Sequence, residues 1–276
     1  MEKKQDRAKN NKRFIFFLVL ASLIVLVAIF APLIAPYDLH ETQLQNALHA
    51  PSKDHIFGTD NLGKDILSSV IYGTRVSVFS TLALVASVFV IGSFLGIVAG
   101  YFGGWVDSLI MRIADIMIAF PGMVLAIAVA GILGPSITNA IIAVTIVTWP
   151  KYARLARSLV LKIKNYDHVV AARVVGGKTT HILMSYMFPN VMPVLLVTAS
   201  MDIGSMMLEL AALSFLGFGA RPPMAEWGLM LSAGRAYMSD APWMMLFPGG
   251  AILLVVVIFN LLGDSLRDIL DPKEER

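Results

Sequence analysis

Three acidic residues lie within apolar stretches of the chain, where a charge is costly: Asp115, Asp202 and Glu209. A charged side chain at the centre of a bilayer costs about 2.5–3.5 kcal/mol even on lenient scales, so such residues usually face a bundle interior or a water path. Asp202 and Glu209 are seven residues apart, which places them two turns apart on one helical face. Either they line the route of a polar or cationic substrate, or they form hydrogen bonds between helices. Asp115 lies within about one turn of Arg112, which favours a capping or pairing role.

The chain offers no set of residues suited to catalysis or to holding a metal. It has no cysteine, and its five histidines are scattered and fall outside the apolar stretches. Gly177-Lys178-Thr179 resembles the end of a phosphate-binding loop, but Ala172 stands where the first glycine of that loop belongs and no strand precedes it. We therefore predict no catalytic residue, no metal site and no cofactor, and the chain is not expected to be an enzyme.

The composition is that of an integral membrane protein. Hydrophobic residues make up 57% of the 276 residues and charged residues only 15%, whereas soluble domains carry about 25% charged residues. Six segments approach the roughly 20 apolar residues that a spanning helix needs, and none contains Lys or Arg. The first is too long for the apolar part of a signal peptide. We predict an all-α protein with six transmembrane helices, at residues 14–35, 76–100, 113–133, 136–150, 191–217 and 243–263.

The distribution of basic residues predicts the sidedness. Seventeen Lys and Arg residues fall in the tails and the connections on one side, against five on the other. Basic residues mark the cytoplasmic side, so both termini are expected in the cytoplasm. Nucleic-acid binding is disfavoured because these charges alternate with apolar spans. The expected organisation is a basic cytoplasmic tail (1–13), a first transmembrane helix (14–36), an extracellular connection (37–75), a five-helix core (76–263) with a cytoplasmic loop (151–190), and a cytoplasmic tail (264–276).

The cytoplasmic loop 151–190 is long and has helical composition. Its first half carries apolar residues near a 3.6-residue period, and residues 169–173 form a second short helix that ends at the Gly176-Gly177 pair. Such a loop is either an amphipathic segment on the membrane surface or a docking element for a soluble partner. Elsewhere, glycines at 92, 96 and 100 predict close packing of a neighbouring helix.

Segment 170–189 resembles the cytoplasmic signature of ABC-importer permeases, E-A-A-x-x-x-G followed nine residues later by I-x-L-P. Ala171, Ala172, Gly176 and Pro189 match it, while valine replaces the glutamate and two aromatics replace the aliphatic residues. The resemblance implies that Ala171, Ala172, Arg173, Gly176 and Pro189 couple the chain to an ATPase.

Other stretches make the resemblance more specific. Residues 58–65 (GTDNLGKD) are similar to the G-T-D-x-L-G-R-D motif of the dipeptide, oligopeptide and nickel permeases, and 213–219, 259–268 and Asp271-Pro272 are similar to other hallmarks of its C-type subunits. Residues 202–204, 206–208 and 225–228 look closer to the nickel permeases, whereas 222–223 and 234–235 look equally like the peptide permeases. The expected cargo is therefore nickel or a nickel chelate, with di- or oligopeptides as the alternative.

This resemblance implies a type I importer. The expected partners are a second permease subunit in a heterodimer, two cytoplasmic ATPases, an extracellular binding protein and membrane lipid, with no nucleic acid. Asp202 and Glu209 are expected in the translocation path. A rival interpretation is an ion-coupled secondary transporter, which such intramembrane acids would suit, although no internal repeat supports it. An intramembrane hydrolase is disfavoured because the predicted spans hold neither His nor Cys.

Overall fold

The computed structural model describes residues 2–39 and 41–270, with side chains from Asn10 onward, and this part of the chain is helical without strands. The expected Asp271-Pro272 hallmark, the rest of the C-terminal tail and the side chains of the first basic residues lie outside the described residues. The helices are α1 (Glu2–Ile34), α2 (Ile66–Phe102), α3 (Gly104–Ile118), α4 (Gly122–Leu133), α5 (Ile137–Ile163), α6 (Asp167–Val174), α7 (Thr179–Ile182), α8 (Phe188–Phe215), α9 (Trp227–Gly234) and α10 (Trp243–Leu270).

The predicted count of six spans is matched only approximately. Among the described residues, four helical segments are long and apolar enough to cross a membrane: Asn10–Ile34, Ile66–Phe102, Thr179–Phe215 and Trp243–Leu270. The pair α3 and α4 passes the same test together, as one bent unit. The fifth helix, α5, is not among them, because Lys151 and the basic residues that follow it interrupt its apolar run.

Two predicted spans have different shapes from those expected. The segment predicted at 113–133 breaks near Pro121 into α3 and α4, which meet at 95°. A proline disfavours helical geometry in the residue before it, which accounts for the break. The segment predicted to end at Pro150 continues as α5 to Ile163, so the first part of the expected cytoplasmic loop belongs to this long helix.

The first two helices are also longer than predicted. The basic N-terminal tail is continuous with α1, which begins at Glu2. The second helix begins at Ile66, ten residues before the predicted span, because the Asp65 carboxylate caps it by accepting a hydrogen bond from the Ser68 N–H at 2.7 Å. The connection after α1 is correspondingly shorter than the expected 37–75.

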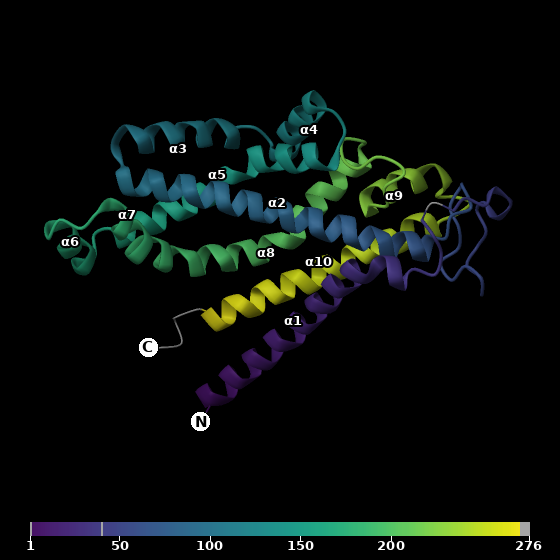
Figure 1. Cartoon of the computed structure of the whole chain (residues 1–276), viewed down its shortest axis with the longest axis horizontal. Helices are drawn as coiled ribbons and strands as arrows, with labels where there is room; N and C mark the ends of the chain where they lie inside the picture. Colours follow the sequence, from purple (N-terminus) through teal and green to yellow (C-terminus); the bar gives the residue numbers. More distant parts are fainter. Residues whose placement is uncertain (1, 40, 271–276) are drawn as a thin grey trace.

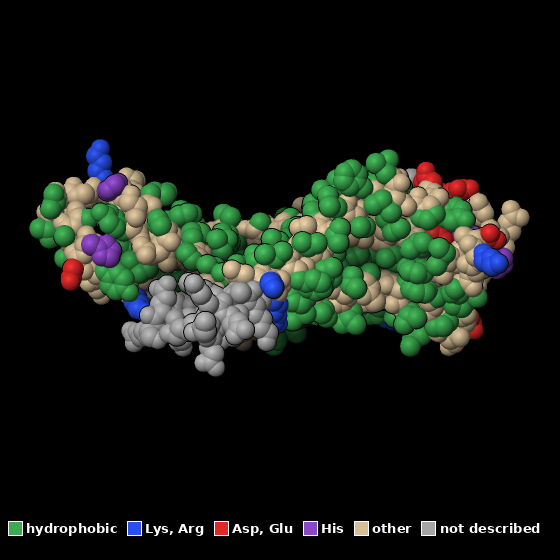
Figure 2. Space-filling view, turned by 90° about the horizontal axis from the view of Figure 1, so that it is seen from below, with side chains coloured by type: hydrophobic (Ala, Val, Ile, Leu, Met, Phe, Trp, Pro, Cys, Tyr) green, Lys and Arg blue, Asp and Glu red, His purple; other side chains and the backbone are tan. Residues whose placement is uncertain are grey.

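The long helices run along the long axis of the molecule, with α2 packed against α5 and α8 against α10 (Figure 1). The short helices α6 and α7 lie at one end, and α9 lies with the segment after α1 at the other. The expected packing role of glycines 92, 96 and 100 is confirmed, since all three face α5. Figure 2 shows hydrophobic side chains over the middle of one face, with acidic and histidine side chains toward the ends. An apolar exterior of this kind suits lipid rather than water.

Candidate functional site

A polar stripe runs along α8 and is partly covered by α5, whose Lys151 and Tyr152 contact it. Thr198, Asp202, Ser205 and Glu209 follow one another at spacings of four, three and four residues, which keeps them on one helical face. Ser205 is exposed and the two acids are half-buried, whereas Met206, Leu210 and Leu213, which border this face, are buried. The predicted common face of Asp202 and Glu209 is therefore present.

Asp202 is paired with a basic residue, although no Lys or Arg lies within a predicted span. The Lys151 Nζ donates to both carboxylate oxygens of Asp202, at 2.7 and 2.6 Å. The buried Tyr152 donates its hydroxyl to Asp202 at 3.0 Å. The pair was missed because Lys151 follows the predicted end of its span, whereas α5 in fact continues and packs against α8.

The environment of Glu209 differs from that of Asp202. Seven residues at a rise of 1.5 Å each place the two acids about 10 Å apart along α8. Within the described part of the chain, the Glu209 carboxylate has no hydrogen bond and no ion pair. On this face Asp202 is therefore neutralised by the ammonium group of Lys151, which is 56% exposed, whereas Glu209 has no ion-pair partner among the described residues.

Two more basic residues of α5 pair with acids of α3. Arg157 makes a two-pronged contact with Asp107, with its Nε and one terminal nitrogen at 2.5 and 2.6 Å from the two carboxylate oxygens. Arg154 contacts Asp115. The pairing role predicted for Asp115 is thus confirmed, although its partner is Arg154 on α5 rather than its sequence neighbour. These contacts hold α3 against the second half of α5.

The residues expected to couple to an ATPase lie mostly on α6. Ala171 is exposed, Ala172 is half-buried, and the Arg173 guanidinium lies over the Tyr101 ring at 5.8 Å from its centroid. The helix ends as predicted at Gly176, whose φ of +85° suits glycine. Pro189 lies apart from these, in the first turn of α8.

Two exposed valines at the end of α6 were not predicted. Val174 and Val175 are 81% and 87% exposed, although both are β-branched apolar residues. Apolar side chains so fully exposed next to Gly176 give α6 a hydrophobic tip. Their position inside the matched motif, between Ala172 and Gly176, was the only signal in the sequence.

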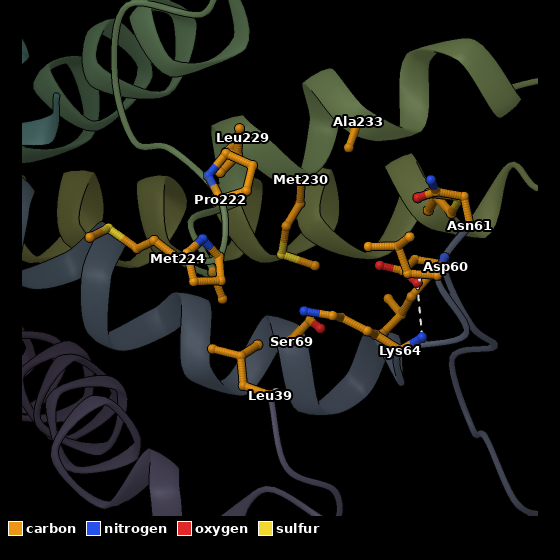
Figure 3. Close-up of a pocket in the computed structure, with 15 residues that line it drawn as sticks. Leu39, Asp60, Asn61, Lys64, Ser69, Pro222, Met224, Leu229, Met230 and Ala233 are labelled. Atoms are coloured by element: carbon orange, nitrogen blue, oxygen red, sulfur yellow. Dashed lines mark hydrogen bonds between the residues drawn. The ribbon is translucent and has the colours of Figure 1, made fainter. Parts of the chain in front are cut away.

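A cavity of about 160 Å³ lies at the α9 end of the molecule (Figure 3). Its walls are mostly apolar and include Pro222, Leu229 and Met230, while Asp60 and Lys64 lie at its edge. The backbone N–H groups of Leu62 and Lys64 donate to the Asp60 carboxylate at 2.8 Å. Burial raises the pKa of Asp60 above its ordinary value, against the opposing effect of these bonds. The 58–65 and 222–223 stretches noted in the sequence thus meet here.

Glu226 has a structural role beside this cavity. It is only 2% exposed, and its carboxylate accepts hydrogen bonds from the N–H groups of Gly228 and Leu229 at 2.9 and 2.8 Å, which caps α9. The Ser77 hydroxyl of α2 contacts the same carboxylate at 3.3 Å and accepts a bond from the Trp227 N–H. The 225–228 stretch, used above as a sign of the cargo, therefore joins α9 to α2.

Comparison with known proteins places these features in a family. The model for the binding-protein-dependent transport system inner membrane component matches residues 92–276, and that for the N-terminal transmembrane domain of oligopeptide transport permease C matches residues 6–51. The chain belongs to this family of ABC-importer permeases, in its dipeptide and oligopeptide branch. It is a multi-pass membrane component of type I fold and not an enzyme.

Several curated relatives resemble the chain over most of its length. It is 46% identical to the dipeptide transport system permease protein of Alkalihalophilus pseudofirmus, over 96% of this chain and 87% of the relative. It is 46% identical to the probable D,D-dipeptide transport system permease protein of Escherichia coli, over 92% and 86%. A glutathione transport system permease protein of Escherichia coli is also 46% identical, over 91% and 83%. None of these three is named for nickel.

Solved structures share the fold. The MetNI methionine ABC transporter in an inward-facing conformation aligns with a TM-score of 0.61 at 17% identity, covering 75% of this chain and 98% of the other. At this identity the likeness concerns the fold alone.

Proposed function

We propose that the chain forms half of the translocation path for di- or oligopeptides in an ATP-driven importer. The 46% identity to a dipeptide permease over 96% of the chain carries this proposal. The peptide reading thus replaces nickel, the first expectation from the sequence. The polar stripe on α8 supports it, because a second permease subunit facing this side would complete a water-filled route between the two.

The same proposal assigns the partners and the sidedness. An extracellular binding protein would deliver the peptide at the α9 end, and two ATPases would act at the α6 end, which is then cytoplasmic along with both termini. The hydrophobic tip of α6, with Ala171, Ala172 and Arg173 before it and Gly176 at its end, would insert into an ATPase groove. Pro189 would set the start of α8 behind it.

An uptake assay tests the cargo. Cells that lack this chain and carry it back on a plasmid should take up a radiolabelled dipeptide, and should not take up radiolabelled nickel above the level of the deletion strain. Proteoliposomes containing the complete transporter should take up the dipeptide only when ATP is supplied, and a proton gradient alone should drive no uptake. Nickel uptake without peptide uptake would overturn the proposal, and uptake driven by the gradient would favour a secondary transporter.

A further inference from the structure

We infer that the α8 stripe binds the two charged ends of a short peptide, an inference that rests on the proposed peptide transport. Lys151 would hold the terminal carboxylate and Glu209 the terminal ammonium group. When the path holds no cargo, Asp202 would pair with Lys151 in place of the peptide carboxylate.

The contact between Lys151 and Asp202 is the one that a peptide carboxylate would make. An ammonium group has three donors, and here it contacts both oxygens of a carboxylate. Lys151 is 56% exposed, so a carboxylate arriving along the path can reach it, whereas Asp202 is 13% exposed and lies behind it. When the cargo displaces Asp202, the Tyr152 hydroxyl still donates to the Asp202 carboxylate. After this exchange the Asp202 carboxylate keeps the hydrogen bond from Tyr152, and the peptide carboxylate accepts hydrogen bonds from Lys151.

Glu209 supplies the complementary charge. It shares one face of α8 with Asp202, and its carboxylate has neither hydrogen bond nor ion pair in the described part of the chain. A half-buried carboxylate gains most from a cation that brings its own donors, because burial without a partner is unfavourable. The ammonium terminus of a peptide is such a cation.

The spacing of the charges selects short peptides. The Lys151 Nζ lies 2.7 and 2.6 Å from the Asp202 carboxylate oxygens, and Asp202 lies about 10 Å from Glu209 along α8, so the two groups that would hold the peptide ends are on the order of 10 Å apart. An extended dipeptide spans about 7 Å and a tripeptide about 10 Å. With a charge-assisted hydrogen bond of about 2.8 Å at each end, a dipeptide bridges groups up to about 13 Å apart. Longer peptides would have to bend to place both termini, so the stripe fits dipeptides best.

Three substitutions test the inference, measured as dialanine uptake by the complete transporter with its binding protein unchanged. Lys151→Met and Glu209→Gln should each lower uptake about tenfold or more, as expected when a charged partner of a bound group is removed. Asp202→Asn should keep or increase uptake, because Lys151 is then free for the cargo. Ser200→Ala is the matched control, since Ser200 lies on α8 outside the stripe and its hydroxyl donates to the Leu196 carbonyl of the same helix.

The outcomes separate this inference from its rivals. A purely structural ion pair predicts equal losses for Lys151→Met and Asp202→Asn, and rescue by exchanging the two residues; either result would overturn the inference. Uptake at the wild-type level in Glu209→Gln would do the same. Should Lys151→Met fail to assemble, Lys151→Gln replaces it, and Lys151→Arg should retain transport. Failure of the proposed function itself is distinct, because wild-type transporter would then take up no dipeptide.

Discussion

Gly96 on α2 lies so close to Ala153 on α5 that a Cβ atom added to Gly96 would collide with the carbonyl oxygen of Ala153 and lie 2.7 Å from the Cβ of Ala156. This approach closes the seam between the two helices, which positions Lys151 and Tyr152 immediately before Ala153 on α5. A backbone contact cannot be relieved by a side-chain rotation, so the two helices must separate to admit a methyl group.

Gly96→Ala should therefore destabilise the protein, by about 1–3 kcal/mol for overpacking. Thermal unfolding of the purified subunit pair in detergent measures the effect as a lower midpoint. Gly250→Ala on α10 is the matched control, because a Cβ there meets nothing within 4 Å. Equal midpoints for the two variants would contradict a tight α2–α5 seam.

Glu226→Gln should lower the stability of the α9 end by about 0.5–2 kcal/mol, the usual effect of removing a helix cap. A glutamine has one acceptor oxygen, whereas the Gly228 and Leu229 N–H groups now bond to different oxygens of the carboxylate. The unfolding midpoint again reports the change, and Asp54→Asn at an exposed position should leave it unaltered. A Glu226→Gln midpoint as high as that of Asp54→Asn would argue against the cap.

The two arginine pairs of α5 should differ in strength. The side chains of Arg157 and Asp107 are 33% and 17% exposed, whereas those of Arg154 and Asp115 are 47% and 63% exposed. Arg157→Leu should cost about 1.5–3 kcal/mol, as for hydrogen bonds to charged groups, and Arg154→Leu less than about 1 kcal/mol, as for surface pairs. Urea unfolding of both variants compares them directly. If Arg154→Leu lost more unfolding free energy than Arg157→Leu, the Arg154–Asp115 pair would be the stronger contact between α3 and α5.

Gly176→Leu should abolish the stimulation of ATP hydrolysis by loaded binding protein while the subunits still assemble. A left-handed backbone costs a branched residue about 1–2 kcal/mol, and the larger side chain also alters the tip of α6. Gly176→Asn separates these effects, because asparagine tolerates positive φ. Asparagine should retain more stimulation than leucine. Full stimulation in Gly176→Leu would move the contact with the ATPase elsewhere.

The sidedness is open to a labelling test. Lys178 should be cytoplasmic and Lys53 extracellular, and both are exposed. A cysteine introduced at each position is the sole thiol of the chain, since the natural sequence has none. In intact cells a membrane-impermeant maleimide should label position 53 and not position 178. The opposite pattern would invert the topology.

Hydropathy predicted most of the long helices, and the glycine pair predicted the end of α6, because both signals are local in the sequence. Two features were not predicted: the bend between α3 and α4, and the continuation of α5 past Pro150. Hydropathy measures how apolar a segment is, and it does not show where a helix bends or ends. The partner of Asp202 was missed for a related reason. Lys151 is 51 residues away, and only the packing of α5 on α8 brings them together.

The uninterrupted length of α2 has a mechanical consequence. Its 37 residues contain no proline and extend for about 55 Å, well beyond the roughly 30 Å hydrocarbon layer. Asp65 fixes one end, and at the other the Lys164 Nζ donates to the Gly100 carbonyl at 3.0 Å while Arg173 lies over Tyr101. Helices bend sharply only at prolines or similar interruptions. The helix is thus one continuous element that joins the α6 end of the molecule to the α9 end, and under the proposed function it would carry a displacement of α6 toward the end where the peptide arrives.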